Sequence, residues 1–248
     1  MFQENFDKLI ADHLNGFSEE YTEGMKNEFM ENQVVIFDSL IPEALKAGVH
    51  AEAKYLLSEH GSRRDITNVE VTGNTPRHYN IVGRDSIAEN ANLIPAFFNS
   101  KVIKGFLAKI NNNETLHAVP YQPEEYIINS QQATGDTHGW HWDDYAFALI
   151  WVVKAPPKGD GALVEYVPNT EWDKSDPKNC VQKVLDTHKV NTLYVPEGAC
   201  YLMKANTTLH RITSLIGNSQ RIVIVFTYAS SEDFNKEITH ETMEQIYS

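Results

Sequence analysis

The hydrophobic pattern changes its period at about residue 121, and this change constrains the fold more than any other feature of the sequence. From Tyr121 onward, short segments rich in β-branched and aromatic residues are separated by turn clusters such as "APPKGDG", "PEG" and "GNSQ". The expected strands are "EYIINS", "WHW" with "AFALIWVV", "ALVEYVP", "NTLYV", "ACYLMK", "TLHRIT" and "RIVIVFTYA". Many short strands between turns are typical of a β-sandwich or jelly roll.

The part of the chain before residue 115 has a helical pattern instead. Ser18–Gln33 and Pro42–Gly61 carry apolar side chains at spacings of three and four, and the second segment has Pro at its start and Gly at its end. A third helix is expected over Ile94–Ile110, before the polar breaker "NNNE". The segment "VVIF" between the first two helices is expected to be a short strand, and the tail 231–248 a last helix.

The chain has 248 residues without an internal repeat, a low-complexity segment or a Pro/Ser-rich linker, so we expect a single domain over 1–248. It would consist of a helical N-terminal layer over about residues 1–115, a jelly-roll core over about residues 121–230 and a C-terminal helical tail over 231–248. The expected fold class is mainly β with flanking helices (α+β).

Charge and cysteine content restrict the partners and the compartment. The formal net charge of −13 argues against a nucleic-acid partner, because phosphates require a basic face. The two cysteines, Cys180 and Cys200, do not make a disulfide framework, which indicates a reducing compartment. No apolar run approaches the ~18 residues of a membrane span, and the start "MFQENFDKLI" does not resemble a signal peptide. We therefore expect a cytoplasmic protein with neither nucleic acid nor membrane as a partner, and leave a homodimer open.

Two histidines and two aspartates stand in "THGWHWDD", where a buried strand begins. His141 and Asp143 are two positions apart, so on a strand their side chains point to the same face. With 10 histidines in the chain, this spacing alone is weak evidence. His50 and Glu52 have the same spacing, but they lie in an expected helix, where positions i and i+2 do not face each other. We reject that pair and expect His50 at the surface.

A second histidine and an arginine follow far along the chain. His210 lies in the expected strand "TLHRIT", and Arg221 begins the apolar strand "RIVIVFTYA" after the turn segment "SLIGNSQ". If these strands form a hairpin, His210 and Arg221 lie roughly opposite each other. An arginine entering a buried strand needs an anion, and its planar guanidinium matches a carboxylate. An internal salt bridge would satisfy Arg221 equally well.

The motif "HWD", the distant "TLHRIT" and the arginine 11 positions after that histidine resemble the Fe(II)/2-oxoglutarate-dependent dioxygenases, whose fold is a double-stranded β-helix, a cupin-like jelly roll. More narrowly, "GDTHGWHWDDYAFALIWVV" resembles the hydroxylases and halogenases of free amino acids, the lysine group above all. The resemblance implies that His141, Asp143 and His210 bind Fe(II) as metal ligands and catalytic centre. It also implies that Arg221 binds the 2-oxoglutarate co-substrate, and that O2 is the oxidant. The halogenases of that group carry Gly where this chain has Asp143, so hydroxylation is expected.

The same resemblance implies a set of substrate-binding residues: His138 and Arg77 for the substrate carboxylate, Asp144 with Glu124 or Glu125 for the side-chain ammonium, and Thr227. Other roles remain open for several of them: His138 could orient a metal ligand, Asp144 could cap a turn, and Arg77 could be a solvated loop residue. Related enzymes place a C-terminal tryptophan against the substrate, and Phe234 or Tyr247 would have to replace it here. Trp140, Trp142 and Trp151 are expected to pack in the core or the pocket wall.

The expected function is Fe(II)- and 2-oxoglutarate-dependent hydroxylation of free L-lysine at C4, with hydroxylysine, succinate and CO2 as products. Three alternatives remain: the same chemistry on ornithine, arginine or another polar amino acid; halogenation, which Asp143 disfavours; and a non-catalytic cupin-type sensor. The expected partner is a small-molecule amino acid.

Overall fold

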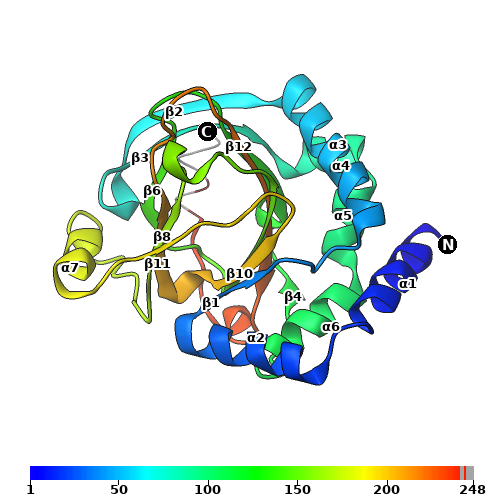
Figure 1. Cartoon of the computed structure of the whole chain (residues 1–248). Coiled ribbons are helices and arrows are strands. Elements are labelled where there is room, and N and C mark those ends of the chain that lie inside the picture. The colour runs from blue at the N-terminus through cyan, green and yellow to red at the C-terminus, as the bar shows by residue number, and fades with distance from the viewer. Residues whose placement is uncertain (241–242, 244–248) are drawn as a thin grey trace.

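The computed structural model describes residues 1–240 and 243, and a strongly curved antiparallel sheet forms its centre (Figure 1). In the described part of the chain the sheet has 12 strands, and ten of them follow the order β1-β10-β7-β12-β5-β3-β6-β11-β8-β9, with β2 paired to β3 and β4 to β12. The strands are β1 Val34–Phe37, β2 Ser62–Val69, β3 Thr75–Val82, β4 His117–Ala118, β5 Tyr126–Gln131, β6 Thr137–His141, β7 Phe147–Lys154, β8 Val164–Pro168, β9 Asn191–Leu193, β10 Cys200–Lys204, β11 Thr208–Ile212 and β12 Arg221–Ala229.

Helices cover the outer face of this sheet. Figure 1 shows α3 to α6 along one side of the curved sheet, α1 and α2 next to α6, and α7 on the opposite side. Their bounds are α1 Phe2–Leu14, α2 Glu19–Asn32, α3 Glu43–His60, α4 Arg84–Asn90, α5 Leu93–Asn99, α6 Lys101–Ile110 and α7 Cys180–Thr187. None of the helices in the described residues has the length and apolar character needed to cross a membrane.

Strand β12 shows why the sheet has two different faces. Its residues at even positions, from Ile222 to Tyr228, belong to the apolar core between sheet and helices, where Phe226 packs on Phe97 and Tyr228 stacks on Phe98. Its residues at odd positions point to the inside of the curve and line a pocket. Because successive side chains on a strand point to opposite faces, one strand supplies both the core and the site.

The expected helix over Ile94–Ile110 is two helices. Helix α5 ends at Asn99 and α6 starts at Lys101, with the buried Ser100 between them. The Ser100 hydroxyl accepts a hydrogen bond from the backbone N–H of Ile103 (3.2 Å) and caps α6. A serine that caps a new helix interrupts the old one, which the apolar spacing alone does not reveal.

Strands β2, β3 and β4 and helix α7 were not expected from the sequence, and no individual helix was expected over α1 or α4. Strands β2 and β3 form a hairpin inside the region expected to be helical, and β3 is inserted between β5 and β6. Helix α7 lies in the loop between β8 and β9. The expected helix over the C-terminal tail is wrong for residues 231–240. This segment contains only a short 3-10 turn, Asp233–Asn235. Residues 241, 242 and 244–248 of that expected helix lie outside the described residues.

The expected hairpin between β11 and β12 is also wrong. Strand β11 pairs with β6 and β8, while β12 lies between β5 and β7. His210 is therefore opposite His141 and Tyr166, and Arg221 is opposite Gln131. Strands that follow each other in sequence often pair in a sheet, but here the chain crosses from one side of the curved sheet to the other between β11 and β12.

Candidate metal centre

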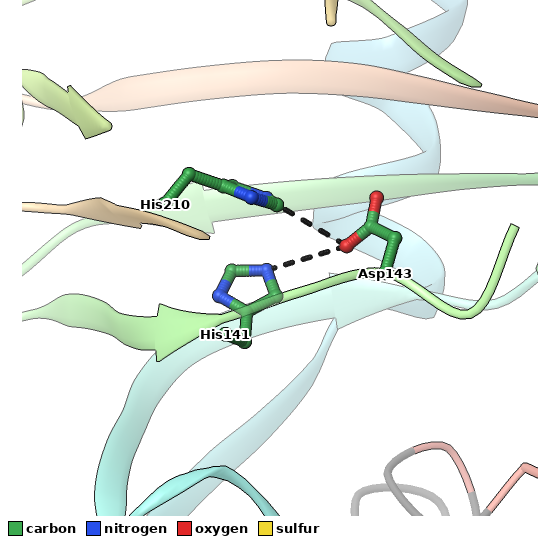
Figure 2. A group of neighbouring side chains, drawn as sticks. All are labelled: His141, Asp143 and His210. Atoms are coloured by element: carbon green, nitrogen blue, oxygen red, sulfur yellow. Dashed lines mark ion pairs between the residues drawn. The ribbon is translucent and has the colours of Figure 1, made fainter. Parts of the chain in front are cut away.

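Three side chains that are far apart in the sequence converge inside the curved sheet. His141 ends β6, Asp143 follows in the next loop, and His210 lies on β11 directly opposite His141. The Nε2 atoms of His141 and His210 lie 3.5 Å and 3.6 Å from Asp143 Oδ1 (Figure 2). Donor atoms on neighbouring positions of an octahedral ion with bonds of roughly 2.1 Å are about 3 Å apart, so these atoms can share one ion after a small shift.

Backbone carbonyls orient both imidazoles. Nδ1 of His141 lies 2.8 Å from the carbonyl oxygen of Gly139, and Nδ1 of His210 lies 2.9 Å from that of Thr208. A carbonyl only accepts hydrogen bonds, so each Nδ1 carries the proton and donates it. Each Nε2 then keeps a lone pair that points toward Asp143, which is the arrangement of metal-ligating histidines.

Burial sets the charges of this group. Burial, together with the neighbouring His138, His210 and Arg77, lowers the pKa of His141 far below its usual value despite the hydrogen bond to Gly139. Burial raises the pKa of Asp143, which His210 and Arg77 partly offset. A neutral His141 imidazole beside a desolvated carboxylate is suited to a divalent cation, which compensates the carboxylate without removing a proton from His141.

Arg221 lies on the inner face of β12 and is buried. Its side-chain contacts among the described residues are long, 3.4 Å to Gln131 Oε1 and 3.4 Å to the Tyr201 hydroxyl. Burial lowers the pKa of its guanidinium, and Tyr201 partly offsets this. Within the described residues no carboxylate pairs with Arg221, so the internal salt bridge considered from the sequence is absent there. A buried guanidinium with this environment is suited to an anionic ligand.

One pocket joins the metal group to Arg221. Among the residues that line it are five of those expected from the sequence to bind ligands: His138, Asp144, Glu124, Arg221 and Thr227. Val223 and Val225, which lie between Arg221 and Thr227 on the inner side of β12, add apolar wall. The pocket therefore has charged groups at separate places along an apolar surface.

His138 stacks on His141, with ring centroids 4.1 Å apart and an interplanar angle of 1°, and also contacts Tyr79. Burial, followed by the nearby Arg77, lowers its pKa well below the usual value. The ring is thus a neutral group at the edge of the metal centre that also faces the pocket. Both roles considered from the sequence remain compatible with this position.

Glu124, not Glu125, faces the pocket. Glu124 ends a 3-10 turn, Gln122–Glu124, rather than lying on the strand as expected, and Glu125 forms an ion pair with Arg84 (2.8 Å). Burial, with the nearby Asp144 and Asp143, raises the pKa of Glu124 to about 9. Strand alternation could not decide between the two glutamates because the strand begins only at Tyr126.

Arg77 is not the solvated loop residue considered from the sequence. It lies on β3, is fully buried, and donates hydrogen bonds to the hydroxyls of Thr75 (3.0 Å) and Thr72 (3.1 Å) and to the Pro76 carbonyl (3.0 Å). The structure does not place it among the residues that line the pocket. Its charge acts on the site at a distance, through His138 and Asp143.

The other aromatic and histidine residues considered from the sequence lie outside the metal group. Phe234 is 53% exposed, its ring contacts His117, and it is not among the residues that line the pocket, while Tyr247 lies outside the described residues. His50 is half-buried rather than at the surface, and Trp151 donates a hydrogen bond to it (3.2 Å). Trp140, Trp142 and Trp151 are buried in the core, as expected.

Several residues in or next to the pocket were not found from the sequence. Lys174 and His240 contact the carboxyl groups of Asp144 and Glu124 from loops that carry no periodic signal. Asn129 and Gln131 line the pocket on β5, and the side-chain oxygen of Asn129 and nitrogen of Gln131 have no hydrogen-bond partner among the described residues. Polar side chains at alternate positions of an apolar strand are a signal that could have located these two.

A curved antiparallel sheet with two histidines and a carboxylate converging inside it defines a double-stranded β-helix protein with a site for a mononuclear metal ion. The chain belongs to the Halogenase D (HalD) family, which it matches over residues 17–248. No curated protein sequence matches it.

Solved structures share this fold at low identity. The epimerase SnoN, in complex with Fe3+, alpha ketoglutarate and nogalamycin RO, has 11% identity and a TM-score of 0.64 over 86% of this chain and 84% of its own. A prolyl hydroxylase from Trichoplax adhaerens has 11% identity and a TM-score of 0.62 over 88% and 94%. An oxidoreductase of the 2OG-Fe(II) oxygenase family from Burkholderia pseudomallei has 14% identity and a TM-score of 0.56 over 86% and 91%. At these identities the likeness concerns the fold, and it confirms the fold class expected from the sequence.

Proposed function

We propose that this protein is an Fe(II)- and 2-oxoglutarate-dependent oxygenase that hydroxylates free L-lysine at C4. The observation that carries the proposal is the joining of three groups in one pocket: the His141, Asp143 and His210 donors, the buried Arg221, and the carboxyl groups of Glu124 and Asp144. The structural neighbours whose titles name iron and alpha ketoglutarate support the choice of cofactors.

The donor set fits ferrous iron, since two neutral imidazoles and one carboxylate on one side of the ion leave positions for co-substrate and O2. Bound iron, with 2-oxoglutarate and O2, supplies the oxidant for an unactivated C–H bond. Arg221 holds the distal carboxylate of 2-oxoglutarate, because among the described residues its guanidinium otherwise has only two long contacts. The inner residues of β12 exclude water between Arg221 and the metal group.

The remaining polar groups position the substrate. Glu124 and Asp144 are two acidic groups at one place in the pocket, which suits a side-chain ammonium. His138 and Thr227 lie on the pocket wall and serve the α-carboxylate end, with the positive charge of Arg77 behind His138. Holding both ends of one amino acid fixes which carbon faces the iron. Ornithine and arginine carry the same two kinds of end group and differ in length.

Halogenation is the second candidate for the reaction, because the name of the matching family, Halogenase D, refers to it. In this chain Asp143 places a carboxylate oxygen 3.5 Å and 3.6 Å from the two imidazoles. A halide would need the ligand position that this carboxylate fills, so we propose hydroxylation.

The test is turnover with each of the twenty amino acids. Anaerobically purified protein is supplied with Fe(II), 2-oxoglutarate and O2, and the products are weighed by mass spectrometry in the presence of chloride. L-Lysine is expected to gain one oxygen, with one succinate released per hydroxylysine. If another amino acid gains the oxygen and lysine does not, the substrate is wrong and the chemistry stands. A chlorinated product would favour the halogenase, and no succinate with any amino acid would favour a non-catalytic sensor.

A further inference from the structure

The two acidic groups of the pocket already have basic partners from within the chain. Nζ of Lys174 lies 3.1 Å from Oδ1 of Asp144, and Nδ1 of His240 lies 2.9 Å from Oε1 of Glu124. The side chains of Asp144 and Glu124 are 4% and 9% exposed, so each partner reaches a carboxyl group inside the pocket. Neither partner belongs to a strand of the sheet.

Lys174 is held in a defined position. Its ammonium lies over the Trp172 ring, 4.1 Å from the ring centre, and donates a hydrogen bond to the Thr239 hydroxyl (3.1 Å). The Trp172 indole in turn donates to the Val71 carbonyl (3.2 Å). The Lys174 side chain is 42% exposed, so it can leave Asp144 for solvent without repacking the core.

The same place has donor atoms spaced for a metal ion, since Glu124, Asp144 and His240 offer ligand atoms within 4.8 Å of one another. The Lys174 ammonium 3.1 Å from Asp144 supplies positive charge there already. A divalent ion beside it would be repelled at close range. The group is therefore better suited to a single ammonium than to a metal.

Resting on the proposed function, we propose that Lys174 is a specificity-determining residue: in the substrate-free protein its ammonium takes the place at Asp144 that the substrate's side-chain ammonium takes on binding. Lys174 pairs with the buried Asp144 carboxylate while the pocket is empty, which offsets part of the cost of burying that charge. The ammonium of a cationic substrate replaces the Lys174 ammonium and forms a new ion pair with Asp144. A substrate with a neutral side chain of the same length leaves the Lys174–Asp144 pair intact and gains no binding free energy from Asp144.

The proposal predicts the direction of a binding change. Lys174→Met removes the competing cation, so L-lysine should bind about 2- to 5-fold tighter, the size expected for one partly exposed ion pair. L-Norleucine, which lacks the side-chain ammonium, should bind with unchanged affinity. Lys174→Arg retains a cation and should keep the weaker lysine binding. Lys183, which pairs with Asp176 (2.7 Å) at the surface, provides the matched control Lys183→Met, with no expected change for either ligand.

Binding is measured by calorimetry on the full chain loaded with Fe(II) and 2-oxoglutarate without O2, so that no turnover follows. Unchanged or weaker lysine binding by Lys174→Met overturns the proposal, as does equal tightening for norleucine, which would indicate a change of pocket shape. A wild-type protein that binds no lysine also overturns it. If lysine binds with the expected contrast between variants but never gains oxygen when O2 is admitted, the proposed function fails and the role of Lys174 stands.

Discussion

Two neighbouring aspartates point to different parts of the site. Asp143 directs Oδ1 toward the imidazoles of His141 and His210, while Asp144 directs its carboxylate toward Lys174. Both follow the end of β6, and the backbone N–H of Asp143 is held by the Ala205 carbonyl (3.2 Å). One position along the chain thus separates a candidate metal ligand from a candidate substrate ligand.

Substitution of each aspartate should therefore have a different effect. Asp143→Gly is expected to bind iron more weakly and to abolish or redirect hydroxylation. Asp144→Ala is expected to retain iron and to raise the KM for lysine about 10-fold or more, as for loss of a charged hydrogen bond. Iron content after desalting and steady-state kinetics measure the two effects. Equal loss of iron from both variants would contradict this division of roles.

The site residues that could be predicted best from the sequence are those whose relative positions depend only on a short segment of the chain. His141 and Asp143 share a local spacing that the chain realises almost as expected, although Asp143 lies just after the strand. Arg77 could not be placed, because its burial depends on the β2–β3 hairpin, which was not foreseen. The choice between Glu124 and Glu125 depends on where one 3-10 turn ends.

At the scale of elements, the pair rejected as a metal site has a structural role. Glu52 of α3 accepts hydrogen bonds from the backbone N–H groups of Asn92, Leu93 and Ile94, at 3.0 to 3.1 Å, and so caps the start of α5. A carboxylate at a helix N-terminus satisfies free N–H groups and interacts favourably with the helix dipole.

Glu52→Ala should lower the free energy of unfolding by about 1–2 kcal/mol, the usual contribution of an N-terminal cap. Glu59→Ala, an exposed position near the end of the same helix, serves as the control and should change it little. Urea unfolding followed by circular dichroism gives both values. Equal stability of the two variants would mean that the α5 N–H groups are satisfied by water instead.

Individual strands were predicted well, and their pairing was not. A period of two is a local property, so the segments from β5 to β12 lie close to the expected strands. The neighbours of β11 depend on where β3, β6 and β8 lie, and these contacts join distant parts of the chain. His210 and Arg221 consequently reach the same pocket from strands that do not touch.

At the scale of the whole molecule, one ion pair connects the β2–β3 hairpin, which was not expected, to the start of the strand that carries His141. Arg63 of β2 donates two hydrogen bonds to Asp136 (2.7 and 2.9 Å), directly before β6. The Asp136 carboxylate also accepts from the N–H groups of Gln132 (2.8 Å) and Ala133 (3.0 Å). The strand that carries His141 is thus held at its start by a buried carboxylate with four donors.

This carboxylate should make stability depend on pH. Burial alone would raise the pKa of Asp136, but the hydrogen bonds from Arg63 and the two N–H groups outweigh it and lower the pKa. A carboxyl group with a lowered pKa in the folded state stabilises it above its unfolded pKa of about 3.9, and this stabilisation is lost as the pH falls through the lower, folded value.

Asp136→Asn should therefore lower the free energy of unfolding at pH 7 by about 2 kcal/mol, as for hydrogen bonds to a charged group. The difference from the wild type should shrink as the pH falls below about 4, because the wild-type carboxyl then becomes neutral as well. Asp65→Asn is the matched control, since Asp65 also pairs with Arg63 but lies at the surface, and its effect at pH 7 should be smaller. Urea unfolding at pH 7 and near pH 3 gives these differences. If the difference in the free energy of unfolding between wild type and Asp136→Asn stays constant over this pH range, the Asp136 side chain stabilises the fold through packing rather than through its charge.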